Sequence, residues 1–325
     1  MANKFFVSPS PHVHGDTTTR GIMADVILAL IPALVVSTWV FGFNVLLITA
    51  ISILSCVVFE YAIQRFMLRG RNTVGDLSAV VTGLLLAFNL PAGIDWWIVV
   101  IGAFVAIAIG KMTFGGLGKN PFNPALTGRI FLLIAYPVQM TDFSVVPAHG
   151  SVDAFSGATM LTQIKESGMA AVDNADFMQM LGGVMNGSMG EIGALALILG
   201  GLYLLWRKVI SWHIPVAVLA TMAVFAACMG LGEGGSLVYE LPLFHILAGG
   251  ALLGAIYMAT DYSTSPMTHR GMLIYGVGVG ALTMIIRLWG AYPEGMSFAI
   301  FIMNATVPLI NKYCRPVRFG VKHVK

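Results

Sequence analysis

Long apolar segments dominate the sequence, and they limit the chain to few folds. A helix needs about 20 apolar residues to cross a bilayer, and fewer where it is broken. Ten segments meet that requirement: residues 22–41, 43–64, 76–91, 96–114, 122–141, 190–206, 212–230, 242–260, 271–290 and 295–311. Only 10% of the 325 residues are charged, whereas a soluble protein carries roughly 25%. The sequence therefore predicts an all-α integral membrane protein with about ten transmembrane helices.

The lysines and arginines between these segments predict their orientation, because positive residues gather on the cytoplasmic side of a membrane. With ten crossings both termini lie on one side. That side collects Lys4, Arg20, Arg65, Arg69, Arg71, Lys111, Lys119, Arg207, Lys208, Arg270, Lys312, Arg315, Arg318, Lys322 and Lys325. The other side has Lys165 and most of the acids, including Glu191 and Glu294. We therefore expect both termini in the cytoplasm and the polar interval 142–189 outside it.

Five segments before this interval and five after it suggest an internal repeat. An odd number of crossings in each half makes the two halves inverted relative to one another. The expected organisation is a cytoplasmic N-terminal segment, a five-helix repeat, an extracytoplasmic loop, a second five-helix repeat and a basic cytoplasmic tail. Their bounds are residues 1–21, 22–141, 142–189, 190–311 and 312–325.

Other common classes of protein are disfavoured. The first 20 residues lack the short apolar core of a cleaved signal peptide, so the first apolar segment is expected to act as the membrane signal. No basic run indicates a nucleic-acid partner. The three cysteines form no CxxC pair, and an iron–sulfur cluster usually needs about four thiolates. His12 and His14 have no further ligand nearby, so no metal site is predicted.

Two polar turns interrupt the apolar segments at matching places in the two halves. Residues 115–126 read GGLGKNPFNPAL, in which Asn123 can cap the helix that follows and proline suits its first turn. Residues 258–266 read MATDYSTSP and place Asp261 at a helix end, and we expect proline to break the helix at Asp261–Pro266. Each turn is either a structural connection or part of a binding site. A third interruption, Asn89–Pro91, would join them at one site for a non-covalent flavin or a cation.

Five ionisable residues lie within or near the apolar segments, where a charge is costly unless it faces a cavity or a partner. These residues are Asp25, Glu60, Asp76, Arg129 and Arg287. Asp25 and Glu60 are near the ends of their segments, so we expect them to reach water. Arg129 lies about two turns into its segment, and we expect a carboxylate or phosphate beside it.

The polar interval contains the stretch Asp153-Ala154-Phe155-Ser156-Gly157-Ala158-Thr159. Its small side chains would let an enzyme approach the Thr159 hydroxyl and would then let a bulky ring fold back. Composition alone favours the simpler interpretation of a flexible exterior loop.

Taken together, these motifs resemble the D component of the Rnf complex, an ion-translocating ferredoxin:NAD⁺ oxidoreductase, and the related B component of the sodium-translocating NADH:quinone reductase. The resemblance covers most of the chain. It rests on Ser8-Pro9, Pro11-His12, residues 76–82, 115–126 and 136–141, Ser156-Gly157-Ala158-Thr159, and Met258-Ala259-Thr260-Asp261.

That resemblance implies a urea-transporter-like fold in a bacterial cytoplasmic (inner) membrane. It also implies FMN joined to Thr159 by a phosphoester bond, with Asp153, Ser156, Gly157 and Ala158 around it. A flavin transferase acting outside the cytoplasm would install this FMN. Thr162 lacks the preceding motif. A non-covalent riboflavin near the broken helices is implied more loosely, with Asn123 and Asp261 as candidate contacts.

The expected function is therefore that of an electron-transfer subunit in a translocating oxidoreductase, with no catalytic residue of its own. Its partners would be the Rnf components A, B, C, E and G, membrane lipid, and Na⁺ or H⁺ as the coupling ion. Two alternatives stay open at this point. One is a component of a sodium-translocating NADH:quinone reductase, and the other is a non-redox urea-type channel on the same fold.

Overall fold

A computed structural model describes residues 17–68, 73–143, 159–168, 172, 176–183, 185–233 and 237–315. These residues are largely helical and contain no β-strand, which confirms the expected all-α fold. The first-half helices are α1 (Thr19–Phe41), α2 (Asn44–Ala62), α3 (Ser78–Phe88), α4 (Trp96–Phe104), α5 (Pro124–Ala135) and α6 (Pro137–Thr141). Between the halves lie α7 (Met160–Ser167) and α9 (Phe177–Gly182). The second-half helices are α10 (Ala194–Trp206), α11 (His213–Glu233), α12 (Leu237–Leu247), α13 (Ala251–Leu253), α14 (His269–Trp289) and α15 (Met296–Tyr313).

Short helices of other types extend several of these elements. Three are π-helical: η1 (Ile63–Leu68) continues α2, η3 (Val105–Ile109) continues α4, and η5 (Gly254–Met258) continues α13. Two are 3₁₀ turns, η2 (Val74–Asp76) and η4 (Met112–Phe114). The two polar turns noted above follow η3–η4 and η5, so a π-helical stretch precedes each of them.

Each of the ten predicted apolar segments contains a helix, and several helices are long enough to cross a membrane. Among the described residues, five helices have the required length and hydropathy, and α12 with α13–η5 makes a sixth if this pair, bent by 66°, is one span. Helices α3, α5 and α10 are apolar but shorter. The protein is thus a multi-pass membrane protein, while ten crossings and the inverted repeat stay predictions.

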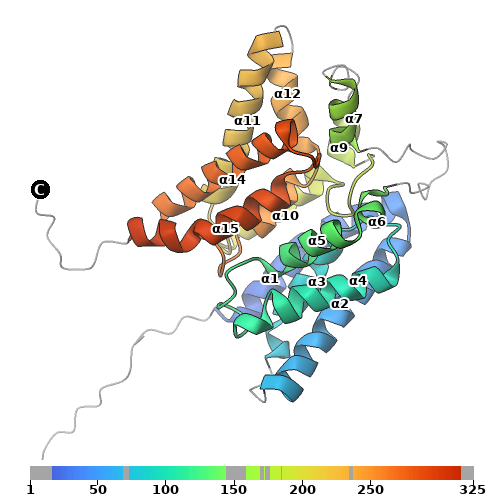
Figure 1. Cartoon of the computed structure of the whole chain (residues 1–325), viewed down its shortest axis with the longest axis vertical. Helices are drawn as coiled ribbons and strands as arrows, with labels where there is room; N and C mark the ends of the chain where they lie inside the picture. Colours follow the sequence, from blue (N-terminus) through green and yellow to red (C-terminus); the bar gives the residue numbers. More distant parts are fainter. Residues whose placement is uncertain are drawn as a thin grey trace, which may run out of the picture.

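The helices form two packed groups (Figure 1). In one group α2 packs against α3 and α4, and α4 against α5; in the other, α11 packs against α12 and α14, and α14 against α15. Contacts of α1 with α10, and of α5 with α15, join the two groups. Large apolar side chains on the outer faces of α1 and α2, such as Val35, Trp39 and Leu54, are exposed, as expected for surfaces that meet lipid.

The first helix break lies between α3 and α4, and the segment before α10 fills it. The Phe88 and Leu90 carbonyls accept hydrogen bonds from the backbone N–H of Gly190 (2.7 Å) and Met189 (3.0 Å). A Cβ atom at Gly190 would lie 2.5 Å from the Phe88 Cβ, so only glycine allows this approach. Irregular backbone is tolerated at such a depth because other protein groups satisfy it.

The second break is not where the sequence placed it. We expected a broken helix at Asp261–Pro266, but the bend falls between Leu247 and Ala251, where Gly249 has φ of +69°. Residues 259–268 are instead a turn between η5 and α14. Proline suggested the wrong position because Pro266 follows the end of a helix, whereas a left-handed glycine produces the bend.

Candidate functional site

Both predicted polar turns line one cavity, which we call the turn pocket. It is a narrow cavity of about 70 Å³ between α1, α3, the turn before α5 and the turn after η5. Its polar wall residues include Ser78, Thr82, Lys111, Asn120, Asn123 and Asp261, and most of the rest are apolar. The structure therefore brings Asn123 and Asp261 together, as expected.

Asn123 is used in holding the two turns together. Its side-chain oxygen accepts hydrogen bonds from the N–H groups of Ala125 (3.0 Å) and Leu126 (3.4 Å), which makes it the N-cap of α5. Its Nδ2 donates to the Met258 carbonyl at 3.3 Å. Both amide atoms thus have partners in the protein, and Asn123 shapes the wall of the turn pocket.

Asp261 and Asn120 supply acceptors in the same pocket. The Asp261 carboxylate accepts from the hydroxyls of Ser263 (2.9 Å) and Thr264 (3.1 Å), while burial raises the pKa of the Asp261 carboxyl above its ordinary value. The Asn120 side chain is 3% exposed and donates to the Phe122 carbonyl, but its oxygen has no hydrogen-bond partner in the described part of the chain. An unpaired buried acceptor is costly, so Asn120 marks where a ligand's N–H or O–H would bind.

Lys111 forms the charged part of the wall. Its Nζ donates to Glu60 Oε2 and to Ser78 Oγ, both at 2.6 Å, and both charged side chains are almost fully buried. Two expectations were wrong here. Glu60 does not reach water, and Lys111 is a buried residue rather than one of the exposed cytoplasmic lysines. Residues far apart in the sequence form this ion pair, so the position of each in its own segment gave no sign of it.

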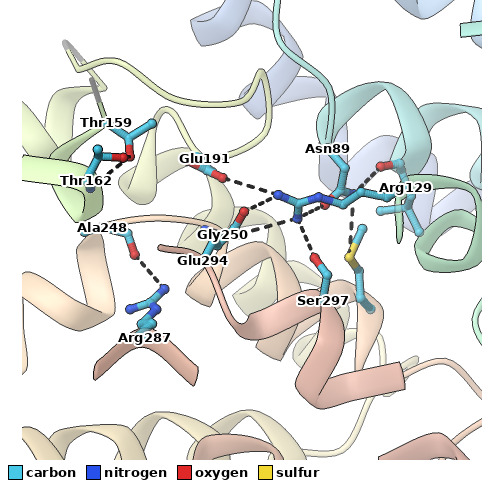
Figure 2. A network of polar contacts seen from close by, with 12 residues as sticks. Asn89, Arg129, Thr159, Thr162, Glu191, Ala248, Gly250, Arg287, Glu294 and Ser297 are labelled. Atoms are coloured by element: carbon cyan, nitrogen blue, oxygen red, sulfur yellow. Dashed lines mark hydrogen bonds and ion pairs between the residues drawn. The ribbon is translucent and has the colours of Figure 1, made fainter. Parts of the chain in front are cut away.

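A second polar cluster surrounds Arg129 (Figure 2). Arg129 donates from Nη1 to Asn89 Oδ1 (2.7 Å) and Ser297 Oγ (2.6 Å), and from Nη2 to Glu294. Glu191 Oε1 lies 4.0 Å from the same nitrogen. The carboxylate partner expected for Arg129 is thus confirmed. The charge count had assigned both glutamates to exterior loops, whereas the Glu191 side chain is 5% exposed and that of Glu294 17%.

The same cluster joins the two helix breaks. Asn89 is the C-cap residue of α3, at the first break. Gly250, at the second break, donates its N–H to Glu294 Oε1 at 2.9 Å. Asn89 therefore contacts Arg129 and, at 3.7 Å, the Met258 sulfur, but it does not line the turn pocket. The single site that we expected from Asn89–Pro91 and the two turns is in fact two separate places, because the chain bends at Ala248–Gly250.

Asp25, Asp76 and Arg287 have other partners. Asp25 accepts from the Tyr203 hydroxyl at 2.9 Å and pairs with Arg207 at 3.3 Å. Asp76 accepts from the N–H of Ser78 at 2.8 Å. Arg287 is 3% exposed and donates to the carbonyls of His245 (2.5 Å) and Ala248 (3.0 Å).

Thr159 is the N-cap of α7. Its hydroxyl oxygen accepts from the N–H of Thr162 (3.3 Å) and lies 2.9 Å from the Thr162 hydroxyl (Figure 2). Lys165 anchors the helix by donating to the Gly290 (2.6 Å) and Tyr292 (2.9 Å) carbonyls. Asp153, Ser156, Gly157 and Ala158 lie outside the described residues.

A further hollow of about 410 Å³, the α7 pocket, lies beside this helix. Leu161, Ile164 and Lys165 of α7 line it together with Leu241, His245 and Arg287. His245 was not predicted as a site residue, although a histidine inside an apolar segment can indicate a binding site. No three His, Cys, Asp or Glu side chains are grouped as a metal site in the part of the chain that the structure describes.

Comparison with known proteins supplies the family. Residues 6–320 match the model of the NQR2, RnfD, RnfE family. The chain belongs to this family. The match extends over nearly all of the apolar segments, so it agrees with the resemblance found from the motifs.

Several relatives are similar over almost their whole length. The D component of the Na⁺-translocating ferredoxin:NAD⁺ oxidoreductase complex of Acetobacterium woodii is 46% identical over 98% of this chain and 96% of its own. The D component of the proton-translocating ferredoxin:NAD⁺ oxidoreductase complex of Clostridium ljungdahlii is 44% identical over 98% and 97%. The D component of the ion-translocating oxidoreductase complex of Ectopseudomonas mendocina is 37% identical over 96% and 94%.

Proposed function

We propose that this protein is the D-type membrane component of an ion-translocating ferredoxin:NAD⁺ oxidoreductase, and that it carries electrons within that complex. Near-full-length similarity to components of this name supports the assignment. The partners would be the other Rnf components. The two relatives are named for different ions, Na⁺ and H⁺, so similarity does not choose between them.

Covalent FMN on Thr159 is the first part of the proposal, and the N-cap position of Thr159 is the observation that carries it. A phosphoester on this hydroxyl would stand at the N-terminus of α7, where unpaired N–H groups and the helix dipole favour an anion. The N–H of Thr162 already points at the hydroxyl oxygen. The residues present therefore fit a phosphoryl group at this position.

A non-covalent flavin in the turn pocket is the second part. The free space inside this pocket is about 70 Å³, so its walls would have to move apart to admit a flavin ring. Its apolar walls suit the faces of a flavin ring, and Asn120 Oδ1 would accept from the ring N–H. A cation fits less well, because the Lys111 ammonium lies in the same wall.

The sides of the membrane follow from the charge distribution. We place the termini in the cytoplasm, and we place α7 and the attachment stretch outside, where a flavin transferase would reach them. The membrane would be the bacterial cytoplasmic (inner) membrane. The protein would position and tune its flavins, because the redox chemistry belongs to the cofactor.

Intact mass after co-expression with a flavin transferase tests the attachment. The purified chain should exceed its sequence mass by FMN less water and should fluoresce in a denaturing gel. Thr159→Ala should remove both signals, because no hydroxyl remains, and Thr159→Ser should restore them at least in part. Thr162→Val is the matched control three residues away and should keep the flavin. Fluorescence retained by Thr159→Ala after denaturation would rule out this attachment site.

A further inference from the structure

We infer that the α7 pocket is the seat of the ring system attached at Thr159, and that His245 contacts the polar edge of that ring. This seat requires the covalent flavin proposed above. What is new is the place where the flavin ring lies and the residue that contacts its edge. Three observations support it: the position of the pocket, two unpaired imidazole nitrogens and a neighbouring arginine.

The position of the pocket comes first. Leu161, which lines it, is two residues after Thr159, and Ile164 and Lys165 follow on the same side of α7. α12, α14 and the loop before α15 complete the wall. A group tethered to the N-cap of α7 is therefore held beside this hollow, and the hydrogen bonds of Lys165 to Gly290 and Tyr292 hold α7 against it.

His245 is the strongest sign of a ligand. The residue is 1% exposed, and neither ring nitrogen has a hydrogen-bond partner among the residues that the structure describes. A neutral imidazole has one N–H donor and one acceptor nitrogen, and leaving both unpaired in a buried place is costly. A carbonyl or an N–H group on the edge of a heterocycle would pair with one of them.

Arg287 fixes His245 and adds a positive charge. Its guanidinium donates to the backbone carbonyls of His245 and Ala248, which are left free where α12 ends. Among the described residues its Nε has no hydrogen-bond partner, and its guanidinium forms no ion pair within 4 Å. The pocket thus offers a cation to an electron-rich ligand.

Gly249 allows these groups to come together. A Cβ atom there would lie 2.6 Å from the Leu161 Cδ1 and 2.9 Å from the Arg287 Nη2, and the backbone has φ of +69°. The bend at the second helix break therefore brings α7 and Arg287 to one place. Leu161, Ile164, Leu241 and Leu288 provide apolar contacts for the faces of a flat ring. A flavin ring has both features, an apolar face and one hydrogen-bonding edge.

Accessibility of the attached flavin tests this assignment. The full chain, co-expressed with the transferase and purified in detergent, is titrated with iodide while flavin fluorescence is recorded. His245→Leu keeps an apolar side chain but removes both nitrogens, so iodide quenching should increase several-fold over the unsubstituted protein. His245→Gln, which keeps a donor and an acceptor, should lie between them. His213→Leu, a change at the start of α11, should leave quenching unchanged.

A second variant tests the same pocket independently, in case His245→Leu misfolds. Ile164→Trp would fill the pocket from α7 itself, and it should also expose the flavin to iodide. Gel fluorescence after denaturation should show equal covalent flavin in every variant. Absence of covalent flavin from the unsubstituted chain would overturn the attachment, and with it this seat. Equal covalent flavin with unchanged quenching in both His245→Leu and Ile164→Trp would overturn the seat alone.

Discussion

The turn pocket and the α7 pocket differ in how their charges are balanced. In the turn pocket the Lys111 ammonium is paired with Glu60, and the unpaired atom is a neutral acceptor, Asn120 Oδ1. In the α7 pocket, among the described residues, Arg287 donates to two backbone carbonyls and both nitrogens of His245 are unpaired. The first therefore suits a neutral ligand that donates hydrogen bonds, and the second suits an electron-rich one.

The Arg129 cluster lies between the two and contacts the surroundings of both. It includes Glu294, which also binds Gly250 next to the α7 pocket, and Asn89, which reaches the sulfur of Met258, whose carbonyl binds Asn123. The comparison shows that each pocket has its own unpaired groups, while one buried ion network supports the backbone of both.

Breaking that network should have the largest effect. Arg129→Leu leaves the Glu294 and Glu191 carboxylates buried without their guanidinium, and removing one partner of a buried pair typically costs about 3–5 kcal/mol. We expect a large fall in the melting temperature of the purified chain and loss of both flavins. The exposed Arg207→Leu, which removes the pair with Asp25, is the control and should melt close to the unsubstituted protein. A small shift for Arg129→Leu would show that the network does not support the fold.

The Lys111–Glu60 pair should give the next effect, confined to the turn pocket. Lys111→Met leaves Glu60 buried and unpaired, at a cost of about 3 kcal/mol, the lower part of the range for such pairs. Lys111→Met with Glu60→Gln should recover stability, because no charge remains. Non-covalent flavin should fall in Lys111→Met while the covalent flavin stays. Equal loss of both flavins would mean that the two pockets are not independent.

Asn120 should have a moderate effect on ligand content rather than on stability. Asn120→Ala removes the unpaired acceptor, and a hydrogen bond worth about 1–1.5 kcal/mol corresponds to roughly tenfold weaker flavin binding. Asn123→Ala is the matched comparison, and it should mainly lower the melting temperature, because a helix cap is worth about 1 kcal/mol. Flavin released on denaturation measures the first effect. Equal flavin loss in the two variants would contradict separate roles.

Asp261 should give the smallest effect, visible as a pH dependence. Burial raises the pKa of its carboxyl in the folded protein, so folding favours the protonated form. Its contribution to stability is therefore present below the ordinary value of about 3.9 and is lost as pH rises through the raised value. Asp261→Asn should weaken this dependence of the melting temperature, measured between acidic and neutral pH. An identical pH profile in the variant would show that Asp261 is not the group responsible.

Much of the fold, and part of the site, could be predicted from the sequence. Hydropathy located the ten apolar segments, each of which contains a helix, because a membrane helix needs a long apolar run wherever it packs. The turn at 115–126 and Asp261 were rightly placed together, because polar side chains that interrupt apolar segments need a shared polar environment. The expected carboxylate partner of Arg129 was found, because an isolated charge at that depth is too costly.

Other features could not be predicted, and each depends on contacts between distant residues. Glu60 looked like a residue at a helix end near water, yet it pairs with Lys111, 51 positions away. Glu191 and Glu294 looked like loop acids, and only the folded chain brings them to Arg129. The second bend was assigned to Pro266, whereas Gly249 adopts the left-handed conformation that makes it.

The sequence by itself determined that this chain enters a membrane as a set of apolar helices, and which polar turns interrupt them. Those properties follow from residues close together in the chain, since hydropathy and helix capping act over one or two turns. The tertiary structure alone decided which buried charges neutralise one another and which polar atoms are left for a ligand. Pairing depends on distances of a few ångströms between side chains from different helices, and the order of residues along one helix does not contain those distances.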